Sequence, residues 1–368
     1  MKILHIITDS NIGGAGKLLL AFLDTFNRDE FDITIILPQK SRLISEISAR
    51  NIKFIEAKHI AEKSFSFKSL CELYYLIFKI WPDIVHTHAS FAGRVAARYL
   101  RRRVVYTRHY AVQNVENMGF FRKKLNFIFA QMFSDAIIAT SQEAYDGLIK
   151  SGVAERIVAM IPNGVLPVRT MDEREKSEVR VRYGISSEAF VVSQIARLST
   201  EKGHVFTLDT AKILMEDSEI IFLLAGDGPL EEDLRLQISE KGIKNVIMAG
   251  FVSDVDEIIN ISNLQINSSF TETTCLALLE GMSAGIPAVA TNVGGNPQVI
   301  SHEGNGLLVP VKNAQAMAKA IKKFKSNKDL YDNCAQNARK IFKAEFDSKI
   351  MTQKIQEIYI HLKGWKHL

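Results

Sequence analysis

The chain has little cysteine, no long apolar run and no cysteine–histidine cluster, and each shortage excludes a class of protein. Three cysteines in 368 residues are too few and too widely spaced for a disulfide framework, which indicates a reducing compartment. No Cys/His cluster has zinc spacing, and no apolar run approaches the roughly 20 residues that span a bilayer. The first residues, MKILHIIT, lack the apolar core and cleavage site of a signal peptide. We therefore expect a cytoplasmic protein.

Charge is distributed unevenly along the chain. Residues 1–165 hold 22 Lys and Arg against 15 Asp and Glu, whereas residues 166–368 hold 24 against 26. A basic first half suits an anionic ligand or peripheral attachment to the anionic inner face of a membrane, and the alternative is an ordinary solvated face. No helix-turn-helix, zinc or RNA-binding signature is present, so we expect no nucleic-acid partner.

Apolar runs bounded by turn residues alternate with helical patterns throughout the chain. Strands separated by helices form parallel sheets, so we expect an α/β fold with two Rossmann-like, doubly wound domains and a ligand at the carboxyl ends of the strands, in the cleft between the domains. The turn-rich stretch MIPNGVLP (160–167) separates them, and residues 347–362 read as a long amphipathic helix. The expected strands are 2–8, 32–37, 53–56, 84–86, 103–107 and 136–140, then 191–195, 220–225, 246–249, 264–268, 288–291 and 306–309.

The stretch TDSNIGGAGKLLL (8–20) holds three glycines between a strand and a helix that we expect from about Lys17. It is not a P-loop, because Asn11 and Leu18 stand where that motif needs Gly and Ser or Thr. It is not a dinucleotide fingerprint either, because Leu19 replaces the third glycine. Two readings stay open here: a weak anion site at the positive helix end, or a plain turn.

A second stretch, TETTCLALLEG (271–281), places seven residues between Glu272 and Glu280. A helix is expected from about Thr273, so that the N–H groups of Thr274, Cys275 and Leu276 would suit a diphosphate. The two carboxylates would then lie roughly 12 Å apart along the helix. Paired glycosidase carboxylates lie about 5–10 Å apart, so this spacing instead fits two ends of one elongated ligand. Without context the spacing is a weak signal.

Other motifs supply that context: IARLSTEKGH (195–204), LLAGDGPLEEDL (223–234), AGFV (249–252), NGV (163–165), SAGIPAV (283–289) and GLLVP (306–310). In this order, and over nearly the whole chain, they resemble the retaining, nucleotide-sugar-dependent glycosyltransferases of family 4, which have the GT-B fold. The resemblance implies an acceptor-binding domain at 1–165 and a nucleotide-sugar-binding domain at 166–346. It also implies that a helix in 347–368 packs back on the first domain.

The resemblance also implies roles for individual residues. Arg197 and Lys202 match the pair that neutralises the diphosphate leaving group, Glu272 the acid that holds sugar hydroxyls, and Glu280 the acid that holds the ribose. His109, in VVYTRHY, matches a histidine that lines the sugar site. Further donor contacts fall on Gly13, Gly14, Gly226, Asp227, Phe251, Val252, Thr273, Thr274, Cys275 and Leu276. Taken singly, these residues also read as surface charges, turn glycines or a buried, hydrogen-bonded histidine.

Two more histidines lie in DIVHTHASFAG (83–93). We take His86 and His88 to alternate across a strand end, so that only one of them faces the cleft. We expect this to be His88, on the acceptor side.

The resulting hypothesis is a retaining transferase that moves a hexose or N-acetylhexosamine from a nucleotide sugar to a hydroxyl of a glycan or lipid-linked acceptor. Its place would be surface-polysaccharide or glycolipid assembly, with UDP as the favoured base because it is the commonest in the family. The resemblance implies same-face attack with the leaving phosphate as base, and no cofactor or metal. A GT-B sugar-nucleotide epimerase and a non-catalytic nucleotide-sugar-binding subunit are the alternatives.

Four local features complicate the pattern. SDVDE (253–257) is a D-x-D, but we expect Asp254 and Glu257 to form the capping box of a helix rather than a metal site. Residues 116–133 mix basic and aromatic residues and fit either a core helix, which we favour, or a membrane-docking helix. ETTC (272–275) replaces the family's commoner glycine-containing EGFG, which leaves the donor sugar open. We assign no family role to RRR (101–103).

Overall fold

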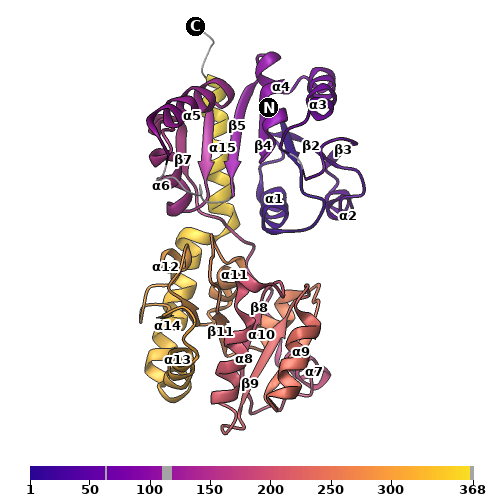
Figure 1. Ribbon diagram of the computed structural model, residues 1–368. Helices are drawn as coiled ribbons and strands as arrows, with labels where there is room; N and C mark the ends of the chain where they lie inside the picture. The colour runs from indigo at the N-terminus through magenta and orange to yellow at the C-terminus, as the bar shows by residue number, and fades with distance from the viewer. Residues whose placement is uncertain (63, 110–117, 365–368) are drawn as a thin grey trace. The chain divides into compact units, whose positions relative to one another are not determined.

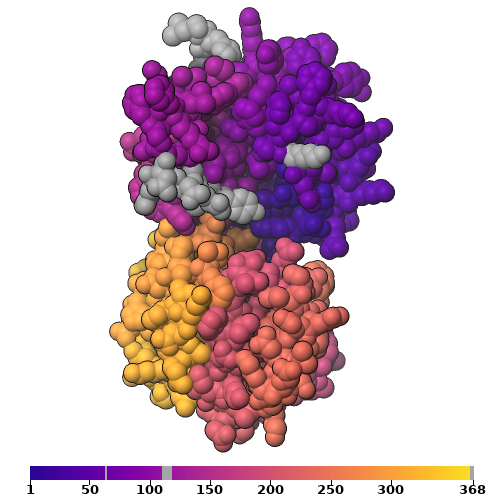
Figure 2. Space-filling model, viewed as in Figure 1, coloured from indigo at the N-terminus to yellow at the C-terminus, as the bar shows by residue number. Residues whose placement is uncertain are grey.

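The computed structural model describes residues 1–62, 64–109 and 118–364, and the chain divides into two compact units (Figure 1). Unit 1 comprises Met1–Val165 and Phe346–Leu368, and unit 2 comprises Leu166–Glu345. In the space-filling view, the indigo-to-magenta part of unit 1 and the rose-to-orange part of unit 2 are each closely packed (Figure 2).

Unit 1 is built on a seven-stranded parallel sheet in the order β3-β2-β1-β4-β5-β6-β7. Its strands are β1 (Lys2–Ile7), β2 (Asp32–Pro38), β3 (Lys53–Ala57), β4 (Ile84–His88), β5 (Arg103–Arg108), β6 (Ala136–Ala139) and β7 (Val158–Met160). Its helices are α1 (Gly14–Thr25), α2 (Leu43–Ala49), α3 (Phe67–Ile80), α4 (Phe91–Tyr99), α5 (Phe120–Phe133), α6 (Gln142–Lys150) and α15 (Ser348–Gly364). Helix α15, drawn in yellow, follows unit 2 in the sequence but belongs to unit 1, where it packs against α1.

Unit 2 has a six-stranded parallel sheet in the order β10-β9-β8-β11-β12-β13. Its strands are β8 (Phe190–Ile195), β9 (Ile220–Ala225), β10 (Val246–Gly250), β11 (Leu264–Asn267), β12 (Ala288–Thr291) and β13 (Gly306–Val309). Its helices are α7 (Glu173–Arg182), α8 (His204–Ile213), α9 (Glu231–Glu240), α10 (Val255–Asn260), α11 (Leu276–Ala284), α12 (Asn296–Val299), α13 (Ala314–Ser326) and α14 (Lys328–Ile341).

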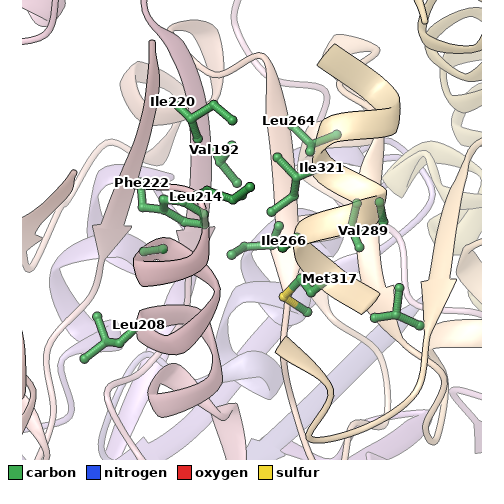
Figure 3. Packing of buried hydrophobic residues seen from close by; sticks show 14 of the residues in the cluster. Val192, Leu208, Leu214, Ile220, Phe222, Leu264, Ile266, Val289, Met317 and Ile321 are labelled. Carbon is green, nitrogen blue, oxygen red and sulfur yellow. The ribbon is translucent and has the colours of Figure 1, made fainter. Parts of the chain in front are cut away.

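The central strands of both sheets are buried on both faces, as expected for parallel sheets that helices cover on both sides. In unit 2, Phe222 and Ile266 of the sheet pack against Leu208 of α8 and Met317 of α13, all nearly inaccessible to solvent (Figure 3). Each such side chain contributes about 1.5–3 kcal/mol by burial. This packing fixes the strand ends, from which the loops of the candidate site begin.

The fold class is confirmed, and each of the expected strands is present. Strand β7 was not expected, because it is short, only partly buried and runs into a turn-rich stretch. Helix α1 begins at Gly14 rather than near Lys17, and α11 begins at Leu276 rather than near Thr273. Both errors concern small or polar residues at helix starts, where side-chain periodicity gives no signal.

Two of the local readings are wrong in part. Asp254 does cap α10, but its carboxylate accepts from Asp256 N at 3.1 Å, and Glu257 pairs with Arg182 instead of completing a capping box. Helix α5 is not a core helix, because it buries only Ala130 and leaves Phe121 86% exposed. Residues 116 and 117 of that prediction lie outside the described residues.

The RRR stretch has a structural explanation. Arg103 pairs with Asp135 at 3.1 Å, and the other oxygen of that carboxylate accepts from the backbone N–H of Val104. The guanidinium of Arg102 lies 4.1 Å from the ring centre of Trp81, a cation–π contact. These residues therefore anchor the start of β5.

Candidate functional site

Three charged residues follow the carboxyl ends of neighbouring strands in unit 2. Arg197 follows β8 and is exposed, whereas Lys202 lies in a 3₁₀ turn and Glu272 follows β11. Lys202 Nζ donates to Glu272 Oε2 at 2.6 Å, and the two side chains are 23% and 8% exposed. The structure thus joins two of the predicted site residues in a largely buried ion pair.

The carboxylate of Glu272 has further partners. Ser269 Oγ donates to Glu272 Oε2 at 3.1 Å and Asn267 Nδ2 at 3.4 Å. Burial opposes the charge of Lys202, but the Glu272 carboxylate and the nearby Cys275 raise its pKa above the ordinary 10.5. The ammonium group is therefore charged at neutral pH and fixed in place, which suits stabilisation of a developing anion.

Close backbone contacts hold the loop that carries Glu272. A Cβ on Gly294, where φ is +51°, would lie 1.8 Å from the carbonyl oxygen of Glu272, and one on Gly203 would lie 2.1 Å from that of Ser268. Gly295 N donates to the Glu272 carbonyl at 2.9 Å. Only glycine permits these approaches. The loop is therefore rigid, and its glycines were not among the predicted site residues.

Buried hydrogen bonds also hold the loop that carries Glu272. Asn296 is fully buried, and its Nδ2 donates to Asn267 Oδ1 at 3.0 Å and to the Thr291 carbonyl at 2.9 Å. Thr291 Oγ1 donates to the Ser269 carbonyl at 2.7 Å. Sequence reasoning missed these supporting residues; the polar run that directly follows an apolar strand was the available signal.

Helix α11 starts three residues later than expected, so its exposed N–H groups come from Leu276 onward. Thr273 and Thr274 lie in the preceding loop, and Cys275 is the N-cap residue, without a side-chain cap. Burial and the Glu272 carboxylate raise the pKa of the Cys275 thiol to about 11, so it stays protonated. Because only the stretch from Leu276 onward is helical, the 12 Å estimate along one helix does not apply.

Glu280 lies on the second turn of α11 and is 9% exposed. Its neighbour Gly281 packs so tightly on β11 that a Cβ would meet Gln265 Oε1 at 1.9 Å. The α11–β11 contact therefore fixes Glu280 relative to the strand from which the Glu272 loop begins.

The glycine turn after β9 supports the Arg197 loop. Leu198 N donates to the Asp227 carbonyl at 2.7 Å, and a Cβ on Gly226 would lie 2.0 Å from the Ala196 carbonyl oxygen. Gly226 therefore has a structural role whatever else it does. Beyond β10, Phe251 is 69% exposed and Val252 is partly buried.

In unit 1, the loop that contains Gly13 and Gly14 is not strained, because neither glycine has a positive φ. Gly13 is the N-cap of α1 with φ −89° and no side-chain cap, and Gly14 is the first helical residue. Both are exposed, and a Cβ on either would meet nothing within 4 Å. Neither glycine is thus required by the packing around it.

The predicted histidines of unit 1 are part of one buried cluster. His86 and His88 do not alternate: they are two residues apart in β4, so their rings lie on the same face and stack at 4.7 Å. Both ring nitrogens of His88 are bonded, to His5 Nδ1 at 3.2 Å and to His109 Nε2 at 3.1 Å. The ring is 7% exposed, so His88 has no nitrogen left for an acceptor. His109 is partly buried.

His5 was not among the predicted site residues. Strands β1 and β4 are parallel neighbours in a register that pairs His5 with His86. Their ring centres lie 4.7 Å apart. The pairing order of the strands, which the sequence does not give, was needed to see this.

Both aspartates of the D-x-D accept hydrogen bonds from backbone N–H groups. Asp254 caps α10, and Asp256 Oδ2 accepts from Arg169 N at 2.9 Å. Within the described residues, His5, His86 and His88 are the group whose ligand atoms approach within 4.8 Å of one another. Also within the described residues, no helix is long and apolar enough to cross a bilayer.

Comparison with known proteins places these features in a family. The model for glycosyl transferases group 1 matches residues 175–341, and the model for glycosyltransferase family 4 matches residues 12–169. The chain is 26% identical to UDP-Gal:alpha-D-GlcNAc-diphosphoundecaprenol alpha-1,3-galactosyltransferase of Escherichia coli, over 98% of this chain and 97% of that one.

Two solved structures share the fold over nearly the full chain. A glycosyltransferase from Rickettsia africae superposes with a TM-score of 0.86 at 20% identity, covering 99% of each chain. HepE from Anabaena, in a complex with UDP and glucose, gives a TM-score of 0.83 at 22% identity, covering 98% of this chain and 99% of that chain. The chain therefore belongs to glycosyltransferase family 4 and has the GT-B fold.

Proposed function

We propose that this protein is a retaining glycosyltransferase that moves a sugar from a UDP-sugar to a hydroxyl of a glycan or lipid-linked acceptor, with an α-linkage as product. The observation that carries the proposal is the buried Lys202–Glu272 pair, held on glycine-packed loops at the carboxyl edge of the unit 2 sheet. The name of the E. coli relative gives UDP-Gal as its donor and alpha-D-GlcNAc-diphosphoundecaprenol as its acceptor, and HepE was crystallised with UDP and glucose, which supports the choice of donor and acceptor class.

The chemistry assigned to unit 2 follows from its charges. Cleavage of the sugar–phosphate bond leaves negative charge on the departing diphosphate, and fixed cations stabilise that charge. We assign this role to Lys202 as a point charge and to Arg197 as a bidentate donor, each bond contributing about 1.5–3 kcal/mol. The N–H groups at the start of α11 would add to it.

The remaining roles complete the proposal. Glu272 would accept bonds from sugar hydroxyls and Glu280 from the ribose, while the backbone at Phe251 and Val252 would meet the base. In unit 1, Gly14 and His109 would contact the donor sugar. Retention would follow from attack on the face that the phosphate leaves, with that phosphate as the base. The alternatives, an epimerase or a non-catalytic binding subunit, are outcomes of the test below.

The test begins with a thermal-shift screen of UDP, GDP and ADP, followed by incubation of the matching nucleotide sugars with a polyprenyl-diphosphate-linked sugar. The expected result is stabilisation by UDP and an elongated lipid-linked product whose anomeric proton coupling indicates an α-bond. A free isomerised sugar nucleotide would mean an epimerase. Stabilisation without any turnover would mean a binding subunit.

Metal independence is part of the proposal, because side chains supply the cationic charge. Transfer should be unchanged by excess EDTA. Loss of transfer that Mn²⁺ or Mg²⁺ restores would contradict this and return attention to Asp254 and Asp256.

We also propose that α5 docks unit 1 on an anionic membrane surface. The helix exposes Phe120, Phe121 and Leu125 beside Arg122 and Lys124, a combination that suits a negatively charged bilayer. The protein should sediment with phosphatidylglycerol vesicles and not with phosphatidylcholine vesicles. Phe121→Glu should abolish sedimentation, whereas Phe67→Glu, at a 75% exposed position of α3, should not. Equal binding by both variants would contradict the assignment.

A further inference from the structure

An unbroken line of hydrogen bonds crosses the interior of unit 1. From end to end its members are Thr107, His86, Tyr359, His5, His88 and His109, which we call the histidine chain. The successive distances are 2.7, 2.5, 3.3, 3.2 and 3.1 Å. It connects three strands of the sheet with α15, a helix that lies more than two hundred residues further along the sequence.

Each member of the chain is neutral. Burial lowers the pKa of His5 to about 3 and that of His109 to about 4. Burial and the neighbouring rings lower the pKa values of His86 and His88 well below 6.5. Burial also raises the pKa of Tyr359 well above 10, so it stays a phenol.

Neutrality fixes how protons are arranged along the chain. A neutral imidazole has one N–H donor and one lone pair, and a phenol has one O–H. With one proton for each bond, all bonds must point the same way. In one arrangement His109 Nε2–H donates to His88, and the direction continues to Thr107. In the other Thr107 donates to His86, and every bond is reversed.

The two arrangements differ at the His109 end. In the first, Nδ1 of His109 carries a lone pair; in the second, it carries the proton. This atom is buried and has no hydrogen-bond partner among the described residues. His109 and Asn163 both line a partly open pocket of about 30 Å³ in unit 1, and Asn163 Oδ1 likewise lacks a partner among the described residues. Such a volume holds about one water molecule.

We propose that Tyr359 and His5 are positioning residues that couple the proton position on His109 to the Thr107 end of the histidine chain. Through the hydroxyl that α15 supplies, the chain as a whole fixes whether His109 offers a donor or an acceptor at Nδ1. The meaning of this for catalysis rests on the proposed function, in which His109 contacts the donor sugar. The coupling itself is a property of unit 1 and can be measured without substrate.

The test uses histidine labelled with ¹⁵N in both ring nitrogens, because the nitrogen shifts distinguish the two tautomers. The wild-type protein should show one dominant tautomer for His109. Tyr359→Phe breaks the chain at its centre and should shift the His109 nitrogens towards a mixture. Thr107→Val, which is nearly isosteric and less disruptive, should shift them in the same direction. Unchanged His109 resonances in both variants would overturn the proposal.

A packing control separates the chain from general loosening. The ring of Phe22 lies 5.2 Å from His5 and 6.4 Å from Tyr359 between centres but donates no hydrogen bond. Phe22→Leu should lower the melting temperature yet leave the His109 tautomer as in the wild type. If it changes the tautomer as much as Tyr359→Phe does, the role is merely structural and the proposal fails.

Kinetics then test the link to function. Tyr359→Phe should lower kcat at least threefold while KM for the donor changes less than twofold, and the Phe22→Leu control should keep wild-type kcat below its melting transition. If neither the wild type nor any variant transfers sugar, but Tyr359→Phe still shifts the His109 tautomer, the proposed function fails and the coupling stands.

A titration with Zn²⁺ tests whether the same ring nitrogens bind a metal ion instead of one another. Neutral imidazoles are good zinc ligands, and three of these lie close together. Hydrogen-bonded as they are, they should not bind zinc at micromolar concentration. Stoichiometric zinc binding by the wild type that is lost in His88→Gln would overturn the proposal, because the nitrogens would then serve a metal.

Discussion

The two units have the same architecture but place opposite kinds of polar group at the ends of their strands. In unit 2, charged side chains lie on loops that follow the strands, and Lys202 and Glu272 neutralise each other directly. In unit 1, His5, His86 and His88 lie within strands, and the neutral members of the histidine chain are held together by hydrogen bonds without an ion pair. A charged pair can bind a charged ligand, whereas a chain of neutral groups can only offer a hydrogen-bond donor or acceptor. One fold thus supports two different kinds of polar chemistry.

The strongest way to break this comparison is to remove the charge of unit 2. Lys202→Ala and Arg197→Ala should each lower transfer at least tenfold, about 1.4 kcal/mol of transition-state stabilisation, with Lys202→Ala also leaving Glu272 buried without its counterion. Initial rates at saturating UDP-sugar are the measurement. Lys241→Ala, which removes a surface ion pair with Asp209, is the control and should be silent. Wild-type turnover in the Lys202/Arg197 double variant would refute the assignment.

The second largest effect is expected from acid, which should destabilise unit 1 more than unit 2. The buried histidines have lowered pKa values in the folded protein, so the unfolded chain binds protons first as pH falls below about 6.5. Stability is therefore complete above that pH and is lost as pH falls towards 4, by up to about 1.4 kcal/mol per histidine and pH unit. Among the described residues, unit 1 has four such histidines, and unit 2 has His204, whose pKa is lowered to about 4.

Hydrogen exchange at pH 7 and pH 5 measures this difference. After correction for intrinsic rates, β1 and β4 should lose more protection than β9 and β11. Equal losses in the two sheets would show that the histidine chain is not what makes unit 1 sensitive to acid.

A pair of glycine variants sharpens the claim that the loops of unit 2 are rigid. Gly242 and Gly294 both have positive φ, +61° and +51°, but a Cβ meets open space at the first and the Glu272 carbonyl at the second. Gly242→Ala should cost about 1–2 kcal/mol from backbone strain alone. Gly294→Ala should cost at least twice as much in thermal or urea unfolding and should weaken UDP binding. Equal costs would mean that the Glu272 loop moves aside easily.

The smallest effect is expected in the glycine loop of unit 1. Gly14→Ala should lower transfer severalfold while the melting temperature holds, because the new methyl group meets nothing in the protein and φ is not strained. Gly16 is different: a Cβ there would lie 3.2 Å from Leu43 Cδ2, so Gly16→Ala should lower the melting temperature slightly and keep transfer near normal. If Gly14→Ala transfers sugar at the wild-type rate, the loop is only a turn.

The two units also differ in how far their sites could be predicted from sequence. Arg197, Lys202, Glu272 and Glu280 lie in motifs whose order matches the family, although each of them taken singly also reads as a surface charge. Gly294 and Asn296 were missed because their role is to approach another backbone segment, which local pattern does not encode. The start of α11 was misplaced since Thr273 and Thr274 suit a loop and a helix start equally well.

Unit 1 was harder to predict for a physical reason. His5, His86 and Tyr359 meet only after strands β1 and β4 pair in register and α15 packs beside them. In the sequence, each of these residues looks like an ordinary buried position within an apolar segment. The error over His86 and His88 was avoidable, since residues two apart in a strand share a face.

The place of α15 in the sequence has a consequence for synthesis. Unit 2 is one continuous stretch, so it can fold as soon as Glu345 has left the ribosome. Unit 1 emerges first, yet its interior stays incomplete until Tyr359 arrives roughly two hundred residues later, about 10–40 s at ordinary elongation rates. Until then α15 is absent, so His5 and His86 lack Tyr359 as a hydrogen-bond partner. The half of the molecule that is made first is therefore finished last.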